Sequence, residues 1–594
     1  MTSSPSNPQN KADLDTYARI SKELIMAGAD SPRRTAAVLA DHGFSPEEWT
    51  RESESWGSAI RRDPLLRDRF HRIYSDPSSS AKETSMSIAV HERMPYQNAK
   101  SAPVRPRSWI WLLIGAALLP FTLFQTVIPG AAWLAPAFLM RFVRTQRARV
   151  ALPALAIVGY VAVLVAIRGF FAGADGYTFA GAGISLVIPY GFDRWLAPRL
   201  GRFARSMVFP SADTAVSFLA SLVSFGTLGL AANSQVGNLS LTKLAAVTGV
   251  FGLSFLISWT ASAVNDLWEH DFRLTNGVSV FRVWLAVLIV VLVAGGAWVG
   301  LTPAAGGTVT VAGLAPSRAT VEAFQIADIR HGRLSAEARA EAYDRHLEPL
   351  ITDLFTRTEQ VAAAGARMVV WSEAAAFVYK EDEAELIDRA RATAIEHGIY
   401  LQIGIIAFLP TDVRPFNENR AIMIDPEGEI LWDYHKATVP LNDGNAPGPG
   451  VIPVADTPFG RIATIICFDA DFPGLVRQAG KAGVDILLVP ASDFGTVGET
   501  HARAAILRAV ENGTALFRPT RMGVSLAVDH NGRQLGYQDD YATGVEQTMW
   551  AILPTDGERT LYSILGDGAG WASVLGIVGL TGAAVVRRRD IRAR

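Results

Sequence analysis

Residues 460–474 read GRIATIICFDADFPG and contain Cys467, the only cysteine in a chain of 594 residues. The apolar run from Ile462 to Ile466 has the length and composition of a buried strand, and Cys467 stands at its end. Two interpretations of this thiol are open: free cysteine often only fills a core, and a cysteine at a strand end can serve as a nucleophile. A single cysteine excludes an intrachain disulfide and a cysteine-rich metal site.

The composition divides the chain into regions of different character. It has 55 Lys and Arg against 57 Asp and Glu, and this near-neutral charge gives no indication of a nucleic-acid partner. Polar, strongly apolar and ordinary globular stretches follow one another along the chain. The predicted parts are a small all-α cytoplasmic module at 1–75, a linker at 76–107, a membrane bundle of about seven spans at 108–302, an α/β domain at 303–562, and a final span with a basic tail at 563–594.

Eight apolar segments predict a multi-pass helical membrane bundle, because a hydrocarbon core of about 30 Å needs roughly 20 apolar helical residues. Arginines gather in alternate loops between these segments, and positive charge stays in the cytoplasm. Both termini are therefore predicted to be cytoplasmic, and the α/β domain to face outward. The predicted spans are 109–128, 131–143, 150–171, 177–193, 212–232, 242–264, 279–301 and 569–586.

In the outer domain, strand-like runs alternate with helical patterns, which predicts an α/β fold with covered sheets. Three of the runs end in Glu373, Lys436 and Cys467. This set suffices for acyl transfer through a thioester, with a carboxylate as base, an ammonium that stabilises the oxyanion and a thiol as nucleophile. A dry pocket is expected to disfavour the ionised carboxylate, and the ammonium to favour the thiolate. The backbone N–H of Phe468 is a second candidate oxyanion donor, and a Cys–His pair with His435 stays an alternative.

Three segments in chain order resemble the motifs of the carbon–nitrogen hydrolase, or nitrilase, superfamily: VVWSEAA at 369–375, WDYHK at 432–436 and IICFDADFP at 465–473. The preceding apolar spans narrow the resemblance to the apolipoprotein N-acyltransferase family. The residues of the membrane region that carry this second likeness are Gln235, Thr248, Gly249, Gly252, Phe255, Leu256 and Asn265. The likeness extends over residues 109–590 and does not include the N-terminal module.

The resemblance implies a four-layer αββα sandwich for the outer domain and a two-step reaction in a bacterial inner membrane. A phospholipid would give its acyl chain to Cys467, and the amine of a diacylglyceryl-cysteine lipoprotein would then take the chain from the thioester. It implies a monomer that needs no cofactor and no metal. Two other functions remain open: a membrane-tethered amidase or nitrilase-type hydrolase with water as acceptor, and a sensor or scaffold with an inert outer domain.

The sequence departs from the family pattern at two acidic positions. The family usually carries a second glutamate in the loop after the lysine, whereas here Asp443 is the nearest acid. Two residues after the cysteine the family usually has glutamate, and here Asp469 stands there. Both aspartates are therefore possible auxiliary acids. Their departure from the family pattern bears more on which acceptor the protein uses than on whether Cys467 can be acylated.

Overall fold

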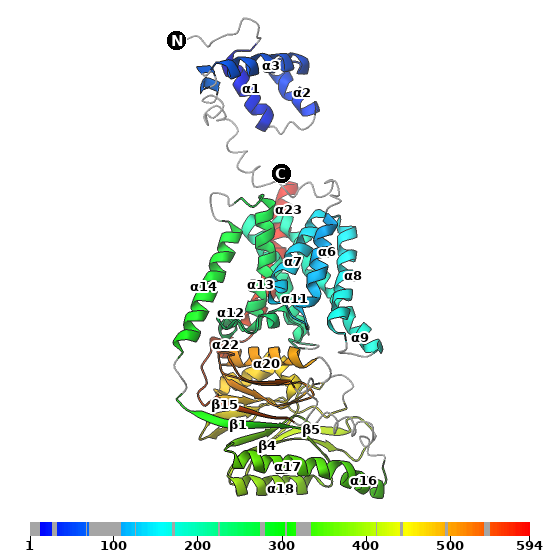
Figure 1. Cartoon of the computed structure of the whole chain (residues 1–594). Coiled ribbons are helices and arrows are strands. Elements are labelled where there is room, and N and C mark those ends of the chain that lie inside the picture. Colours follow the sequence, from blue (N-terminus) through cyan, green and yellow to red (C-terminus); the bar gives the residue numbers. More distant parts are fainter. Residues whose placement is uncertain are drawn as a thin grey trace. The chain divides into compact units, whose positions relative to one another are not determined.

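The computed structural model divides the chain into two compact units, residues 1–97 and 98–594, and each is described by itself (Figure 1). The residues that the structure describes are 12–26, 32–63, 65–66, 68–70, 108–124, 126–168, 173–223, 226–273, 279–302, 306–316, 334–411, 413–439, 444–493, 497–539 and 547–593.

The first unit holds three helices around a small aromatic core. They are α1 (Leu14–Met26), α2 (Pro32–Asp41) and α3 (Pro46–Arg62). Ser45 and Glu48 form a reciprocal capping box at the start of α3, with the Ser45 hydroxyl accepting from the Glu48 N–H and the Glu48 carboxylate from the Ser45 N–H. Trp49 and Trp56 are buried, as expected of residues that hold a small module together.

The second unit begins with an apolar helical bundle. Among the described residues, four helices are long and apolar enough to cross a membrane: Ala148–Ala166, Ala245–Glu269, Val280–Leu301 and Gly568–Arg587. Eight crossings therefore stay a prediction. The helices of the bundle are α6 (Trp109–Leu118), α7 (Pro129–Thr145), α8 (Ala148–Ala166), α9 (Gly173–Ala180), α10 (Val187–Leu196), α11 (Arg202–Ser221), α12 (Leu239–Thr242), α13 (Ala245–Glu269), α14 (Val280–Leu301) and α23 (Gly568–Ala593).

Two predicted spans differ from the helices found. The span predicted at 212–232 overlaps α11 only over 212–221, because α11 begins ten residues earlier, at Arg202, and ends at Ser221. Its first turn carries arginines, and Arg202 is paired with the buried Asp266 at 2.8 Å. A hydropathy pattern leaves charged residues out of a predicted span, so it does not find the start of this helix. The span predicted at 177–193 is broken into α9, a 3₁₀ turn and α10. There Gly183 approaches Gly159 so closely that a Cβ would lie 2.3 Å from the Gly159 carbonyl oxygen.

The α/β domain between α14 and α23, for which we keep the name outer domain from its predicted topology, has two β-sheets stacked face to face with helices on both outer faces (Figure 1). The first sheet has the order β15-β1-β2-β4-β5-β6, with β3 paired to β4, and the second has the order β14-β13-β11-β9-β8-β7. The first sheet's strands are β1 (Thr308–Ala315), β2 (Met368–Trp371), β3 (Ala376–Tyr379), β4 (Tyr400–Phe408), β5 (Asn417–Ile424), β6 (Ile430–His435) and β15 (Gln547–Pro554). The second sheet's strands are β7 (Val454–Thr457), β8 (Gly460–Thr464), β9 (Ile486–Leu488), β11 (Ala515–Arg518), β13 (Val524–Val528) and β14 (Gln534–Asp539), and a two-stranded ribbon joins β10 (Ala491–Ser492) to β12 (Thr520–Arg521).

Three apolar layers hold this sandwich together. One lies between the sheets and includes Val370, Ile462 and Phe517. A second lies between the first sheet and helices α17 (Glu348–Ala363) and α18 (Glu383–His397), and a third between the second sheet and helices α19 (Pro473–Ala482) and α20 (Gly498–Asn512). The predicted αββα architecture is confirmed, and its physical basis is that each sheet is apolar on both faces.

The bundle contacts the outer domain through α20 and the turn after β8, and α20 lies on the side of the sandwich that faces the bundle (Figure 1). Thr227, in the loop before α12, donates two hydrogen bonds to the Asp471 carbonyl oxygen, from its N–H at 2.7 Å and from its hydroxyl at 3.1 Å. In α13, Gly249 breaks the helix with a φ of 67°, and the buried N–H of Val250 after the break donates to the Glu511 carboxylate at 2.6 Å. The turn that carries Cys467 is thus braced directly by the bundle.

Candidate active site

The ends of three strands bring Glu373, Lys436 and Cys467 together between the two sheets. Glu373 follows β2, Lys436 follows β6, and Cys467 begins the short 3₁₀ helix η10 (Cys467–Asp471) after β8. Each of the three residues is only 4% exposed. The Lys436 ammonium donates to Glu373 Oε1 at 2.6 Å, and the charges of both groups act on the nearby Cys467 thiol.

Both carboxylate oxygens of Glu373 are paired. Besides Lys436, the Asn419 side-chain amide donates to Oε1 at 2.7 Å, and the Ser492 backbone N–H donates to Oε2 at 2.8 Å. Burial opposes the ionisation of Glu373, but the ammonium of Lys436 and these hydrogen bonds outweigh it, so the pKa of Glu373 is lowered. At neutral pH Glu373 is therefore an ionised, fixed proton acceptor.

The backbone at the nucleophile is held in an unfavourable conformation. Cys467 has a φ of 46° and Ala374, next to Glu373, has a φ of 50°, and both values lie in the left-handed region. For non-glycine residues such a conformation costs of order 1–3 kcal/mol and persists only where the surroundings impose it. The Cys467 N–H donates to the Pro490 carbonyl oxygen at 3.0 Å, and its Sγ lies 3.7 Å from the Ser492 carbonyl oxygen. These two contacts fix the position of the turn that carries the sulfur.

The thiol is protonated in the resting site. Burial, together with the negative charge of Glu373, raises the pKa of Cys467 well above its usual range, and the opposing charge of Lys436 is insufficient. Both effects expected from the sequence are present with the expected sign, but each is outweighed: the carboxylate is ionised despite its burial, and the thiol is neutral despite Lys436. The reason is the 2.6 Å pairing of Lys436 with Glu373, which directs the ammonium to the base and not to the sulfur.

Asp469 is a structural acid, since its carboxylate accepts five hydrogen bonds. The Tyr434 hydroxyl donates at 2.8 Å and the Ile466 N–H at 3.0 Å. Thr438 donates both its N–H at 2.7 Å and its hydroxyl at 2.5 Å, and the Ala437 N–H donates at 3.4 Å. Asp469 therefore ties the segment after the lysine to the turn that carries the cysteine.

The other predicted residues take different places. Phe468 is buried and packs edge-on against Phe472, with ring centroids 5.2 Å apart. Asp443 lies outside the described residues. His435 has a side chain 32% exposed and lies 4.0 Å from Asp433, so the ammonium of its neighbour, and not its imidazole, contacts Glu373.

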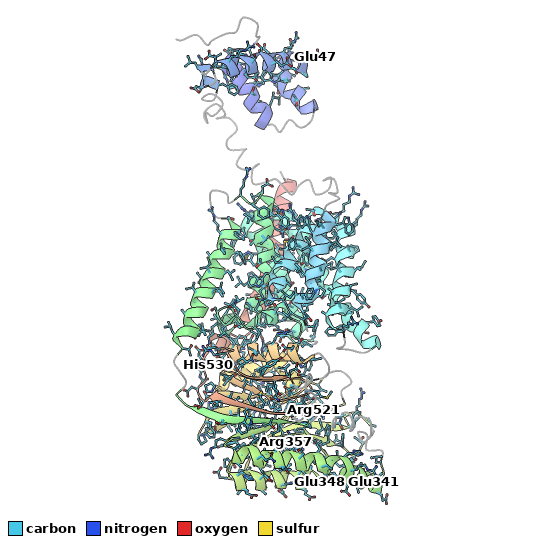
Figure 2. All side chains as sticks on the ribbon, viewed as in Figure 1. Glu47, Glu341, Glu348, Arg357, Arg521 and His530 are labelled. Carbon is cyan, nitrogen blue, oxygen red and sulfur yellow. The ribbon has the colours of Figure 1, made fainter. Side chains whose placement is uncertain are left out.

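The structure adds residues that sequence reasoning did not single out. Asn419 belongs to a run of four polar residues, NENR, at the start of the largely buried strand β5, and a polar run within a buried strand was a usable signal for a buried function. Arg521, which is labelled in Figure 2, had no such signal. It links the loop after Glu373 to β10, by donating to the Ala374 carbonyl oxygen at 3.0 Å and to the Ser492 hydroxyl at 2.9 and 3.0 Å. Only the packing of the two sheets brings these segments together.

A second buried polar group lies beside the sulfur. Asp493 is paired with Arg518 at 3.0 Å, and His501 Nδ1 lies 3.0 Å from the same carboxylate. Burial opposes the ionisation of Asp493, but Arg518 and His501 lower its pKa to about 2. Cys467, Asp493 and His501 offer one donor atom each within 4.8 Å of one another, a spacing that suits a metal ion. Because the Arg518 guanidinium already neutralises Asp493, we assign no metal to this group.

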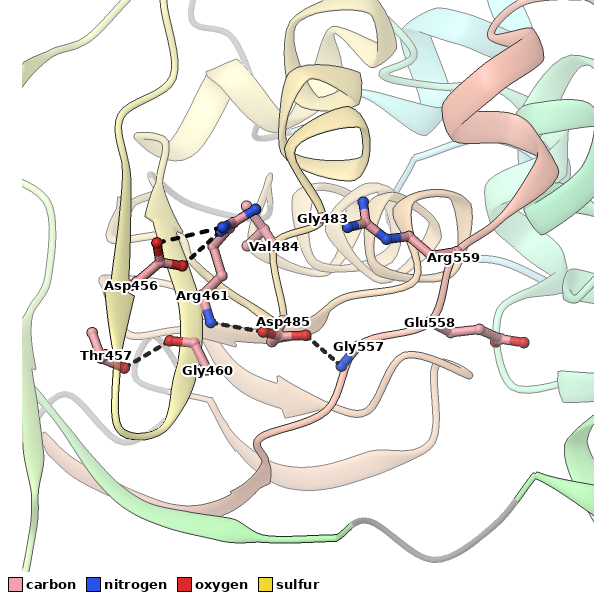
Figure 3. A pocket seen from close by; sticks show the side chains of 10 residues that line it. All are labelled: Asp456, Thr457, Gly460, Arg461, Gly483, Val484, Asp485, Gly557, Glu558 and Arg559. Atoms are coloured by element: carbon pink, nitrogen blue, oxygen red, sulfur yellow. Dashed lines mark hydrogen bonds and ion pairs between the residues drawn. The ribbon is translucent and has the colours of Figure 1, made fainter.

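A polar hollow elsewhere in the outer domain does not include these residues. It lies at the β7–β8 turn and the segment before α22 (Leu561–Leu565), and its lining includes Arg461, Asp485 and Arg559 (Figure 3). Arg461 is paired with Asp456 at 2.8 Å, and Asp485 accepts from the backbone N–H groups of Arg461 and Gly557. The charged groups here mainly pair with one another, so the hollow is a structural junction.

The similarity of this chain to known proteins agrees with the geometry of the candidate active site. Residues 331–548 match the family model described as carbon–nitrogen hydrolase. This region is a carbon–nitrogen hydrolase domain. It contains Glu373, Lys436 and Cys467, and the resemblance predicted from the three motifs is confirmed.

The similar proteins are of two kinds, an apolipoprotein N-acyltransferase and amidases. An apolipoprotein N-acyltransferase of Geobacter metallireducens is 25% identical over 477 residues, which cover 74% of this chain and 82% of the relative. A deaminated glutathione amidase of Yersinia enterocolitica is 24% identical over 204 residues, 31% of this chain and 70% of the relative. A solved amidase from Nesterenkonia sp. is 20% identical and covers 42% of this chain and 91% of its own, with a TM-score of 0.33. The acyltransferase match extends well beyond the carbon–nitrogen hydrolase domain.

Proposed function

We propose that the chain is a membrane N-acyltransferase that moves a fatty acyl chain from a phospholipid to the amine of a diacylglyceryl-cysteine lipoprotein. The observation that carries this proposal is the buried contact of Glu373, Lys436 and Cys467 in a chain whose similarity to an apolipoprotein N-acyltransferase includes the apolar bundle. A bundle that sets the site at a bilayer surface suits two lipid-anchored substrates, because it raises their local concentration.

In the first step, the thiol proton passes to Glu373 as the sulfur attacks the acyl ester carbonyl. Burial is the largest obstacle to ionising the thiol and the charge of Glu373 is the next, and the transferred proton removes the second of these. The same transfer releases Lys436 from its carboxylate partner, so the ammonium can stabilise the new oxyanion together with the Phe468 N–H. Protonated Glu373 then gives its proton to the departing glycerol oxygen, leaving an acyl thioester on Cys467.

In the second step, the acceptor amine attacks the thioester, Glu373 takes a proton from the amine nitrogen, and the C–S bond breaks. The membrane placement that fits this scheme has both termini in the cytoplasm and the outer domain on the periplasmic face of a bacterial inner membrane. The arginine bias of the alternate loops supports it. Asp469 serves to position the nucleophile turn, and Asp443 is left without an assigned role.

The experiment is intact-protein mass spectrometry of the detergent-purified chain after incubation with phospholipid. The expected result is one added acyl mass on Cys467, which is discharged by a synthetic diacylglyceryl-cysteine peptide. Release of free fatty acid at the same rate with and without the peptide would instead support a membrane-tethered carbon–nitrogen hydrolase with water as acceptor. That alternative is favoured by the amidase similarity of the domain. Absence of any adduct would refute both schemes for phospholipid.

A further inference from the structure

A second set of titratable groups contacts the reacting sulfur, and the mechanism above does not use it. His501 lies on α20 and faces two carboxylates, Asp493 through Nδ1 at 3.0 Å and Asp471 through Nε2 at 3.6 Å. One His501 nitrogen, one Asp493 oxygen and Cys467 Sγ all lie within 4.8 Å of one another. An amine that attacks a thioester on this sulfur must come within a few ångströms of these groups.

Asp471 is the unusual member of the set. It is only 1% exposed, and its Oδ1 has no hydrogen-bond partner among the described residues. Its Oδ2 is 3.6 Å from His501 Nε2, which is beyond a normal hydrogen bond. Burial raises the pKa of Asp471 to about 6, although His501, Arg508 and Arg518 oppose the rise. A buried carboxylate with an unpaired oxygen is a place where a cation or a proton is stabilised.

The charged groups around His501 are not equally available. Asp493 is already neutralised by Arg518, whose guanidinium donates to both of its oxygens at 3.0 and 3.1 Å. Arg508, also on α20, is paired with Glu511 at 3.0 Å. Asp471 is therefore the acid of this group whose charge is least compensated by direct contacts.

The acceptor has a proton to lose before it can react. An α-amine has an ordinary pKa of about 7.7–8.0, so at pH 7 most of it is an ammonium without a lone pair. Two protons must leave this nitrogen in all, one before attack and one as the amide forms. Glu373 can take only one of them, because it holds a single proton and needs it to regenerate the thiol.

We propose that His501 and Asp471 form a site that binds the ammonium of the acceptor and takes its first proton. The ammonium transfers one proton to this pair and becomes a free amine, the amine forms the C–N bond at the thioester carbonyl, and Glu373 takes the second proton. The C–S bond then breaks, Glu373 returns its proton to the sulfur, and the pair releases the first proton to water. This inference rests on the proposed acyltransferase function.

The test separates the two half-reactions of the full-length protein in detergent. The thioester is formed first from phosphatidylglycerol and followed by its mass on Cys467. Its discharge is then timed with a diacylglyceryl-cysteine peptide at pH 7 and pH 9, with a blank that lacks acceptor. Hydroxylamine serves as the second acceptor, because it is already uncharged at neutral pH. The variants are His501→Gln and Asp471→Asn, and His530→Gln is the matched control, a partly buried histidine of the same domain.

The unaltered protein and the His530→Gln control are expected to discharge to the peptide with little change between the two pH values. For His501→Gln and Asp471→Asn we expect discharge to the peptide to fall about tenfold at pH 7, where only about a tenth of the amine is free, and to recover at pH 9. Thioester formation, and discharge to hydroxylamine, should stay within about twofold of the unaltered protein. Asp471→Asn keeps the shape of the side chain, so it remains informative if His501→Gln folds poorly.

A merely structural role would give a different pattern. Equal loss with peptide and hydroxylamine, slower thioester formation, or a peptide rate that is unchanged at pH 7 in both variants would overturn the inference and leave the proposed function standing. Absence of a thioester in the unaltered protein would overturn the proposed function, and the inference with it.

Discussion

The two sides of the Cys467 sulfur differ in how completely their charged groups are paired. On one side, Glu373 accepts hydrogen bonds at both oxygens, from Lys436, Asn419 and Ser492. On the other side, Asp471 keeps one oxygen without a partner among the described residues. A fully paired buried charge fixes geometry, whereas an unpaired one leaves a favourable place for an incoming cation. The difference fits our proposal that Glu373 and Lys436 serve the thiol and that Asp471 serves the acceptor.

The same contrast separates two aspartates of a single 3₁₀ helix. Asp469 accepts five hydrogen bonds that join the nucleophile turn to the segment after Lys436. Asp471, two residues later, is held by its backbone to Thr227 and leaves its carboxylate facing His501. One acid therefore supports the scaffold, and the other is available for chemistry.

The largest expected effect comes from removing the sulfur. Cys467→Ser should abolish the acyl adduct, because the hydroxyl proton is much less acidic than that of a thiol and the same base cannot remove it. Mass spectrometry is unambiguous here, since Cys467 is the only cysteine. A stable adduct or normal turnover in this variant would show that the nucleophile lies elsewhere.

Next in size is the loss of the ammonium on the paired side. Lys436→Met should slow acylation by about 10² or more, because the oxyanion loses its charged partner. It should also destabilise the protein by about 3–5 kcal/mol, since Glu373 would be left buried and unpaired. The double variant Lys436→Met with Glu373→Gln is the control: it should recover thermal stability without recovering acylation. Equal melting temperatures of the single and double variants would contradict the assignment of the pair.

The pH dependence of stability tests the unpaired side. The pKa of Asp471 is raised to about 6 in the folded protein, from an ordinary value of 3.8, so the folded state binds this proton more tightly than the unfolded state. Its stabilising contribution is present below pH 3.8 and is lost as pH rises through about 6, a loss of roughly 3 kcal/mol at most. Asp471→Asn should lack this loss. The melting temperature of the variant, relative to that of the unaltered protein, should therefore rise between pH 4 and pH 7. Parallel melting curves across this window would argue against an unpaired Asp471.

The smallest expected effect compares the two aspartates at fixed pH. Asp469→Asn should lower stability by about 2 kcal/mol at pH 7, because an amide cannot accept all five donors and leaves some of them unsatisfied. Asp471→Asn should leave stability unchanged or raise it, because it removes an uncompensated charge. Thermal unfolding of both variants in the same detergent measures this difference. Similar losses in the two variants would remove the distinction between the scaffold acid and the available acid.

Much of the architecture was predictable from sequence because it follows from local patterns. Alternating strand and helix signals predicted the α/β domain, and the reactive residues at three strand ends predicted which segments meet, since strands of stacked sheets end in a common place. The membrane region was less predictable. Hydropathy finds apolar length, but it missed the start of α11, where Arg202 is neutralised by Asp266 from another helix.

The sequence by itself determined the three motif residues, the apolar character of the bundle and the layered fold, because each of these depends on neighbours along the chain. Only the tertiary structure decided the ionisation of the site and the nature of its second side. Glu373 is ionised because Lys436 lies 2.6 Å away. One oxygen of Asp471 has no hydrogen-bond partner among the described residues, and the other lies 3.6 Å from His501, beyond a normal hydrogen bond. These properties depend on distances between residues that are tens to hundreds of positions apart, and electrostatic energies change too steeply with distance and burial for a pattern along the chain to predict them.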